Sequence, residues 1–310
     1  MKSSISSSSF RRIKGESAEN RLSNPKHKTI NGYILVKIQH SDKKLGLIAG
    51  MGELPIAVAG EAKSQGYTIC AIALEPLADK SLSSHVDEIK WVNVGKLGTL
   101  INSLKKSGIK EAVMAGKVSK TLLYKSKITP DLRAVKLLFT LKDRRDDSIL
   151  LAIAKELADE GIELLDITLF STGLLMPEGV LTKNKPSNDE WKDIEFGWKM
   201  AKEIGRLDIG QTVVVKDRAV MAVEAIEGTD EAIKRGGKLA GEGAVVVKVS
   251  KPNQDMRFDV PAVGLQTLSA MQEVKARVLC VEAKKSLILN KDKLLEEAKI
   301  AGISIVGYSG

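Results

Sequence analysis

The sequence predicts an α/β fold with two domains, and three observations lead to that prediction. Short apolar runs alternate with helix-like segments from Leu45 onward, a pattern typical of parallel sheets covered by helices. The chain has 310 residues, enough for two domains of about 100–200 residues each. It is 43% apolar and 28% charged, and it has no apolar run near the roughly 18–20 residues that span a membrane. This argues against an integral membrane protein.

The first domain is expected over residues 45–173. Four apolar runs predict strands buried on both faces: LGLIAG, YTICAIAL, IKWVNV and EAVMAG. Helices are predicted between them over LPIAVAGEAKSQG and KLGTLINSLKKSG, and afterwards over 130–142 and 147–160. IELLDITLF predicts one more strand. A segment rich in Gly, Pro and Ser follows it, and the domain boundary is expected there, near Gly173. The expected domain is a Rossmann-like parallel sheet with helices on its faces.

The second domain, over residues 174–310, is predicted to be mixed α/β. QTVVVKDRAVMAVEAI and RVLCVEAKKSLIL are each expected to form two strands joined by a charged turn, which implies more antiparallel pairing. Helices are predicted over 190–206, 229–240, 264–276 and 291–301. Cys70 and Cys280 lie in apolar runs and are expected to be small buried hydrophobes.

Positive charge is concentrated in two places. Residues 1–44 hold ten basic residues against three acids in a Ser-rich stretch, which predicts a disordered tail. The segment from Lys117 to Arg145 holds nine basic residues against two acids, which favours an anionic ligand or membrane surface. The same pattern also suits a packed helix with a solvated charged face. Residues 45–310 are nearly neutral, with 38 basic and 36 acidic residues, so no nucleic-acid partner is expected.

A glycine-rich turn follows the first predicted strand. Gly50 and Gly52 precede a helix, so freed backbone amides could face a phosphate. Pro55 stands where a dinucleotide fingerprint has its third glycine, which argues against NAD binding. Lys117 ends the fourth strand and is expected at the same edge of the sheet, where it could meet a phosphate or simply be solvated.

Acidic side chains surround a second strand-to-helix turn. Thr229 is suited to cap the helix that begins there. Gly228 and the helix amides could receive an anion. Glu227 or Asp230 could contribute to a Mg²⁺ site, because Mg²⁺ prefers oxygen ligands.

The segment KPNQDMRFDVP combines acidic and basic side chains. In an extended chain its alternate residues share a face, which would group Asp255, Arg257 and Asp259 opposite Met256, Phe258 and Val260. The two aspartates would then stand roughly 13 Å apart at Cα, too far to grip one metal ion. An exposed ladder of charges on an edge strand is the alternative interpretation.

Together these motifs resemble the LpxI family, hydrolases of lipid A synthesis. The resemblance covers about Leu45 to Tyr308 and rests on LIAGMGELP, MAGKVSK, Asp146-Asp147-Ser148, PEGVLT, EAIEGTDEAI, KPNQDMRFDVPAVGLQT and AGISIVGY, in that order. The EAIEGTD and KPNQDMRFDVPAVG segments are the specific ones. One departure is Arg145, where the family usually has glycine before the two aspartates.

The resemblance implies hydrolysis of UDP-2,3-diacylglucosamine to UMP and 2,3-diacylglucosamine 1-phosphate, with a Mg²⁺ or Mn²⁺ ion. It implies that the catalytic aspartate lies in the segment from Asp255 to Asp259. We expect Asp255 to be that residue, with Asp259 as the alternative. Arg257 is expected to stabilise negative charge. The expected metal ligands are Asp255, Glu227 and Asp230. The expected substrate-binding residues are Gly50, Gly52, Lys117, Gly228, Thr229, Lys251 and Gln254.

The expected partners are a nucleotide-sugar lipid and, transiently, an anionic membrane surface. The expected location is the cytoplasm, at the inner membrane when the substrate is bound. The oligomeric state stays open, a homodimer included. A non-catalytic nucleotide-binding or regulatory protein is the alternative function, and a nicotinamide oxidoreductase is disfavoured by Pro55.

Overall fold

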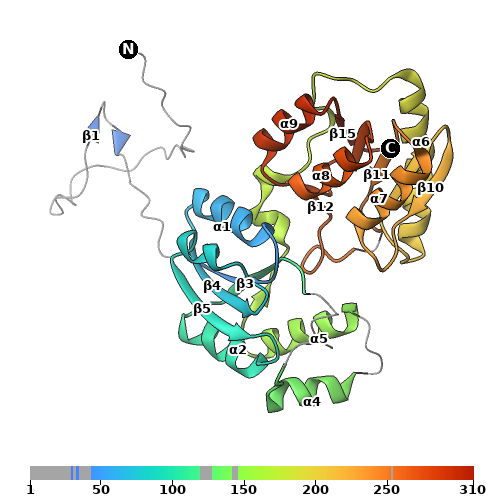
Figure 1. Ribbon diagram of the computed structural model, residues 1–310. Helices are drawn as coiled ribbons and strands as arrows, with labels where there is room; N and C mark the ends of the chain where they lie inside the picture. Colours follow the sequence, from blue (N-terminus) through green and yellow to red (C-terminus); the bar gives the residue numbers. More distant parts are fainter. Residues whose placement is uncertain (1–28, 31–32, 35–42, 119–127, 142–145, 253) are drawn as a thin grey trace. The chain divides into compact units, whose positions relative to one another are not determined.

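The computed structural model describes residues 29–30, 33–34, 43–118, 128–141, 146–252 and 254–310 (Figure 1). It divides the chain into the units Met1–Ser41 and Asp42–Gly310. The first unit contains two short antiparallel strands, β1 (Thr29–Ile30) and β2 (Tyr33–Ile34). Most of the tail lies outside the described residues, so its disorder stays a prediction.

Five parallel strands form the first sheet of the second unit, in the order β5-β4-β3-β6-β7. They are β3 (Lys44–Ala49), β4 (Thr68–Glu75), β5 (Glu88–Asn93), β6 (Glu111–Ala115) and β7 (Glu163–Leu164). Leu47 of β3 is in register with Ala71 and Val113. These three side chains pack on one face, while Ile48 and Ile72 pack on the other. The predicted parallel sheet, apolar on both faces, is confirmed.

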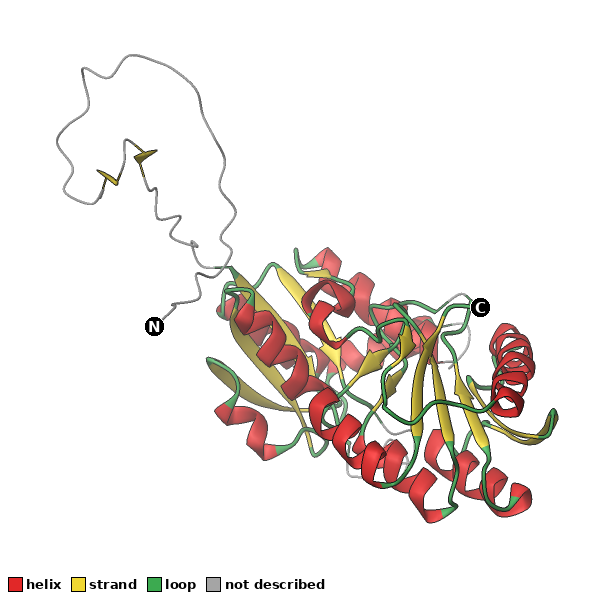
Figure 2. Cartoon of the chain, turned by 90° about the horizontal axis from the view of Figure 1, so that it is seen from above, coloured by secondary structure: helices red, strands yellow, loops and turns green. Residues whose placement is uncertain are grey.

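Helices lie on both sides of these strands (Figure 2). They are α1 (Leu54–Ser64), α2 (Leu97–Lys106), α4 (Leu132–Thr140) and α5 (Asp146–Asp159), with a short 3₁₀ helix at Lys80–Ser84. The carboxylate of Asp131 caps α4 by accepting the amide of Ala134 at 2.9 Å. It also accepts the amide of Gly98 at 2.8 Å, which ties α4 to α2. The predicted helices at 130–142 and 147–160 are confirmed.

The apolar run IELLDITLF does not form one continuous strand. Only Glu163–Leu164 joins the sheet, and 3₁₀ helices follow at Ile167–Phe170 and Thr172–Leu174. The carboxylate of Asp166 accepts the amide of Thr168 at 2.7 Å. This local bond gives the backbone an alternative to the sheet and ends the strand early. The predicted strand is therefore wrong beyond Leu164.

The second sheet is mixed, in the order β10-β9-β11-β13-β15-β8. Its strands are β8 (Gly179–Val180), β9 (Thr212–Lys216), β10 (Ala219–Val223), β11 (Val245–Lys248), β13 (Val278–Glu282) and β15 (Ser304–Tyr308). Strands β11, β13 and β15 are parallel, and the other three pair antiparallel. The predicted mixed α/β fold of residues 174–310 is confirmed, as is the hairpin QTVVVKDRAVMAVEAI, while the domain boundary near Gly173 stays a prediction.

Helices α6 to α9 pack against this sheet. They are α6 (Asn188–Arg206), α7 (Thr229–Ala240), α8 (Leu265–Glu273) and α9 (Lys291–Ile300). Close packing depends on glycines: a Cβ on Gly236 of α7 would lie 2.6 Å from Cβ of Val214. Asp193 of α6 accepts the amides of Asp217 and Arg218 at 3.1 and 2.6 Å, which holds the β9–β10 turn.

The second predicted strand pair is divided between two sheets. β13 pairs with β11 and β15, whereas β14 (Leu287–Ile288) forms a separate parallel pair with β12 (Ala262–Val263). The strands of RVLCVEAKKSLIL are therefore confirmed, but they do not pair with each other.

Both cysteines are buried, as predicted. Burial raises the pKa of the Cys70 thiol to about 11 and also raises the pKa of Cys280. Their thiols are therefore suited to packing rather than to nucleophilic chemistry. In the described part of the chain, no helix combines the length and the apolar character required to cross a bilayer.

We predict that Gly116→Val strongly destabilises the first sheet. Gly116 has a φ of +92°, and a Cβ there would lie 2.8 Å from the backbone of Gly50 and Met51. A β-branched residue is strained at this φ and would also push the two strands apart. Thermal denaturation should show a clearly lower Tm than wild type. Gly60→Ala in α1 is the control: nothing lies within 4 Å of its Cβ, and we expect about 0.5–1 kcal/mol of stabilisation. An unchanged Tm for Gly116→Val would contradict the prediction.

Candidate functional site

The glycine-rich turn after β3 lies beside the end of β6. Ala49 and Ala115 are in register, so Gly50 and Lys117 leave the same edge of the sheet. Met51 and Lys117 exchange two backbone hydrogen bonds of 2.9 Å. A Cβ on Gly50 would lie 2.8 Å from the Lys117 carbonyl oxygen, so this approach requires glycine. Gly52, at φ +102°, has open space around it. The common edge is confirmed; phosphate binding there stays a prediction.

Helix α7 begins with Gly228 rather than Thr229 at the cap. Gly228 has a φ of +86° and precedes the first helical residue, Thr229. The Thr229 hydroxyl is used elsewhere: it donates to Glu224 Oε1 at 2.9 Å and accepts from Lys248 Nζ at 2.9 Å. The predicted capping role of Thr229 is therefore wrong. Because Lys248 and Glu224 flank it, the hydroxyl connects two charged side chains instead.

Lys248 and Glu224 form a buried charged cluster around Thr229. Lys248 ends β11, Glu224 directly follows β10, and both are buried. Desolvation lowers the pKa of the Lys248 ammonium, and nearby Lys117 acts in the same direction, against Glu224, Asp259 and Asp230. Among the described residues, Glu224 Oε2 is a buried carboxylate oxygen with no hydrogen-bond partner. A buried orphan oxygen of this kind can receive a ligand proton or a metal ion.

Neither Lys248 nor Glu224 was predicted from the sequence as a site residue. Lys248 interrupts the valine run AVVVKVS, and Glu224 follows AVMAV. A charge inside an otherwise buried strand was the available signal, because such charges are rarely buried without partners.

The segment after β11 folds as a turn. The amides of Phe258 and Asp259 donate to the carbonyl of Asp255 at 3.0 and 3.2 Å. Met256 and Val260 pack with the apolar residues of the first sheet. The predicted extended ladder is therefore wrong, and the separation of roughly 13 Å expected for an extended chain does not apply. The turn gives the two aspartates different surroundings.

The carboxylate of Asp255 forms an ion pair with Arg257. The guanidinium donates to both carboxylate oxygens, with Nε 2.9 Å from Oδ1 and Nη2 2.7 Å from Oδ2. These bonds hold the pKa of Asp255 below its usual range. Arg257 also lies over the ring of Phe258, at 5.0 Å from its centre. The pair is suited to shaping the turn.

Asp259 has the opposite character. It keeps solvent-exposed surface, yet dense protein around it raises its pKa by desolvation. Lys248, Lys251 and the amide of Gln254, whose Nε2 lies 2.5 Å from Asp259 Oδ2, oppose that rise. A reachable carboxylate with a raised pKa, held by a directed hydrogen bond, is the environment of a general base.

Glu282 anchors the start of this turn. Its carboxylate accepts the Ser250 amide at 2.8 Å and pairs with Lys202. The Ser250 hydroxyl and the Lys251 amide in turn lie 3.1 and 2.9 Å from Gln254 Oε1. The Gln254 amide is thereby oriented with its nitrogen toward Asp259. This chain of contacts holds Asp259 from the end of β13.

The expected metal ligands are not brought together. Glu227 pairs with Arg235 at 2.5 Å, Asp255 is held by Arg257, and Asp230 lies 3.4 Å from the Thr267 hydroxyl. Across the described ranges, no three His, Cys, Asp or Glu side chains are grouped as a metal site. Mg²⁺ usually takes one or two carboxylates plus substrate phosphates. Asp230 and Glu224, whose carboxylates both act electrostatically on Lys248, fit that smaller donor set, and Glu224 Oε2 has no hydrogen-bond partner among the described residues.

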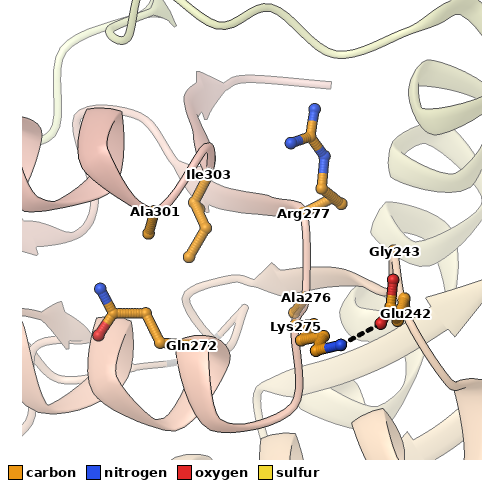
Figure 3. A pocket seen from close by; sticks show the side chains of 8 residues that line it. All are labelled: Glu242, Gly243, Gln272, Lys275, Ala276, Arg277, Ala301 and Ile303. Atoms are coloured by element: carbon orange, nitrogen blue, oxygen red, sulfur yellow. Dashed lines mark hydrogen bonds and ion pairs between the residues drawn. The ribbon is translucent and has the colours of Figure 1, made fainter.

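A separate hollow of about 700 Å³ lies at the other end of the second sheet (Figure 3). Gly243, Arg277 and Ile303 line it, and they precede β11, β13 and β15 respectively. Lys275 pairs with Glu242 at one side of it, and Arg277 donates to the Gly302 carbonyl at 2.7 Å. Because Lys248 and Glu282 stand at the opposite, carboxyl ends of these strands, the hollow is not part of the candidate site.

Family models match both halves of the chain. One described as the LpxI N-terminal domain matches residues 44–174, and one described as the LpxI C-terminal domain matches residues 177–306. A relative from Caulobacter vibrioides, named UDP-2,3-diacylglucosamine pyrophosphatase LpxI, is 31% identical over 276 residues. That match covers 86% of this chain and 97% of the relative.

Solved structures resemble the chain only weakly. Phosphoribosylglycinamide synthetase from Anaerococcus prevotii is 15% identical, with 62% of this chain and 41% of that one covered and a TM-score of 0.23. The gox2253 structure is 10% identical, with 86% and 89% covered and a TM-score of 0.29. Neither supports an argument about fold or function.

We predict that the two aspartates respond to different neighbours. Gln254→Leu removes a hydrogen bond to the Asp259 carboxylate, so the pKa of Asp259 should rise further above its usual value. Arg257→Leu should raise the lowered pKa of Asp255 and leave Asp259 almost unchanged. Carbon-detected NMR titration of labelled aspartates measures both. Each variant is the control for the other, and a common shift of both carboxyls in either variant would show that the turn had simply unfolded.

Proposed function

Because the chain belongs to the LpxI family, we propose that it hydrolyses the diphosphate of UDP-2,3-diacylglucosamine. Water attacks the β-phosphorus, the bond from that phosphorus to the bridging oxygen breaks, and UMP leaves with the bridging oxygen. The other product is 2,3-diacylglucosamine 1-phosphate. The observation that carries this proposal is the 31% sequence identity to the named pyrophosphatase, in an alignment that covers 97% of that relative's length.

The polar cluster at the end of β11 supports hydrolysis rather than binding alone. It offers a reachable carboxylate, Asp259, next to a buried cation, Lys248. A carboxylate with a raised pKa can accept a proton from water, and a nearby cation can offset charge on phosphate oxygens. We therefore assign the proton-accepting role to Asp259. Asp255 keeps Arg257 in place and shapes the turn that presents Asp259.

Substrate binding is proposed for the residues around this carboxylate. Gly52, in open space after β3, and Lys117 offer a backbone amide and an ammonium group to phosphate oxygens. Gly50 acts indirectly, by allowing the close backbone approach. Gly228 and Thr229 start α7, whose first amides favour an anion. Lys251, whose Nζ lies 2.6 Å from Asp208, and Gln254 border the turn from the other side.

We propose Mg²⁺, or Mn²⁺, as the cofactor. Asp230 and Glu224 would hold it, because the orphan oxygen of Glu224 lies in the same charged cluster as Asp230. When bound, the ion would neutralise the diphosphate. The protein residues do the remaining work of orienting the substrate and accepting the proton.

The substrate carries acyl chains, so we propose that it is taken up at an anionic membrane surface on the cytoplasmic side. The support is the excess of seven positive charges between Lys117 and Arg145, because basic segments are attracted to anionic lipids.

We predict that Asp259→Asn loses UMP release by orders of magnitude while the protein remains folded. Asparagine keeps the shape but cannot accept the proton. Because desolvation by the surrounding protein raises the pKa of Asp259, the folded state disfavours its charged form. That penalty develops as the pH rises from the ordinary pKa of about 3.9 through the raised one. The Tm of Asp259→Asn at pH 8 should therefore equal or exceed that of wild type.

Asp255→Asn is the matched control and should retain most of the activity with a lower Tm, since Arg257 loses its partner. A dead Asp255→Asn beside an active Asp259→Asn would return the catalytic role to Asp255, the residue that the sequence favours. If a non-catalytic nucleotide-binding role were correct, wild type would bind UMP and release none from the substrate.

We also predict that a chelator abolishes turnover and that added Mg²⁺ restores it. The two proposed ligands are too few to bind the ion tightly without phosphate. Mg²⁺ should therefore raise the Tm only when UMP is present. A rise with Mg²⁺ alone would indicate a preformed metal site instead.

A further inference from the structure

The outer face of α4 is apolar although nothing in the described structure covers it. Leu132 is 89% exposed, Phe139 is 87% exposed and Leu138 is 41% exposed. In Figure 1, α4 lies at the outer edge of a group formed with α2 and α5. Leu132 and Phe139 share one face of this nine-residue helix, whereas the less exposed Leu138 lies about 100° away from Phe139 around the helix axis. Two almost fully exposed large apolar side chains on one face are more than the isolated exposed hydrophobics of an ordinary surface.

Helical geometry separates this face from the core. At about 100° per residue, Leu132, Lys136 and Phe139 fall within an arc of about 60°. Leu137, with Ala134 and Leu141, points to the opposite side and packs into the core cluster of the first sheet. Arg133 lies between the two faces, bonded to Glu156 and Glu160 of α5 at 2.5 and 2.8 Å. The helix is therefore held in place by one face, while the described residues leave its other face uncovered.

The charges carried by α4 itself are of one sign. Within α4 the charged residues are Arg133 and Lys136, both basic, and Lys136 is exposed between Leu132 and Phe139. The sequence from Lys117 to Arg145, which contains α4, has a net charge of +7. Apolar side chains beside basic ones match a surface with anionic headgroups above acyl chains. A second copy of this chain would bring the same positive charge and be repelled.

We propose that the outer face of α4, formed by Leu132, Lys136 and Phe139, is the surface by which this protein docks on an anionic lipid bilayer. Leu132 and Phe139 enter the boundary between headgroups and acyl chains, and Lys136 stays among the phosphates. This inference deepens the proposed function by naming the surface that meets the membrane. It does not depend on the hydrolysis itself.

The test is co-sedimentation of the full chain with vesicles of phosphatidylglycerol or of phosphatidylcholine. Wild type should bind the anionic vesicles and bind the neutral ones at least about tenfold more weakly. The double variant Leu132→Ser/Phe139→Ser should lose about tenfold or more of the binding to anionic vesicles. Lys136→Glu should weaken it by a similar factor, and more so at low salt.

Ile300→Ser is the matched control. Ile300 is a large apolar residue that is 78% exposed at the end of α9, a helix other than the one that carries the proposed docking face. It should bind vesicles as wild type does. Since Leu132 and Phe139 make little contact with the protein, the double variant should keep the wild-type Tm and its hydrolysis of detergent-solubilised substrate.

Wild-type vesicle binding by the double variant, with its fold intact, would overturn the proposal. So would a dimer in sedimentation velocity that the double variant converts to monomer, because the face would then bind a second copy. Vesicle binding without hydrolysis would contradict the proposed function and leave this surface standing. Hydrolysis without vesicle binding would do the reverse.

Discussion

The candidate site depends on the cost of holding charged groups among the buried ends of β-strands. Lys248 ends a strand whose other residues are valines, and its ammonium is removed from water. A buried charge of this kind requires hydrogen-bonding partners. Thr229 accepts a hydrogen bond from Lys248 and donates one to Glu224, so the beginning of α7 and the end of β10 are held against the end of β11. The need to pair the buried Lys248 ammonium thus helps to set the positions of α7, β10 and β11.

The same requirement separates two aspartates that lie four residues apart. Arg257 takes both oxygens of Asp255 and lowers its pKa, whereas desolvation raises the pKa of Asp259. Two carboxyls in such different environments are suited to different tasks. The ion pair of Asp255 stabilises a turn, and the turn carries Asp259 toward Lys248. Glu282, at the end of β13, completes the arrangement by orienting Gln254 through Ser250.

The proposed substrate-binding residues and the proposed membrane-docking face lie on different elements of the fold. The edge of the first sheet supplies a backbone junction, in which Gly50 and Gly116 allow Met51 and Lys117 to bond directly. Helix α4 supplies an apolar and basic outer face, while Leu137 and Arg133 hold it to the domain. The lipid substrate proposed for this chain, with its charged nucleotide end, would need both kinds of surface.

The sequence by itself determined the order of the elements and the fold class. Runs such as LGLIAG and EAVMAG can be buried on both faces only in a covered sheet, so periodicity and composition were sufficient. It also identified the glycine turn and placed Lys117 at the same edge, since parallel strands end together. The family resemblance followed from local motifs and needed no structure.

Tertiary structure decided what those motifs do. Asp166 and the turn at Asp255 replaced predicted extended segments, because side-chain hydrogen bonds gave the backbone an alternative. Strand β14 pairs with β12 and not with β13, the strand before it in the sequence. This pairing is set by long-range contacts, which the local sequence pattern does not predict. Lys248 and Glu224 come together from separate strands, and Asp255 and Asp259 differ only through partners and desolvation. Burial and pairing across distant segments set the character of each charge, and neither is contained in the spacing of residues along the chain.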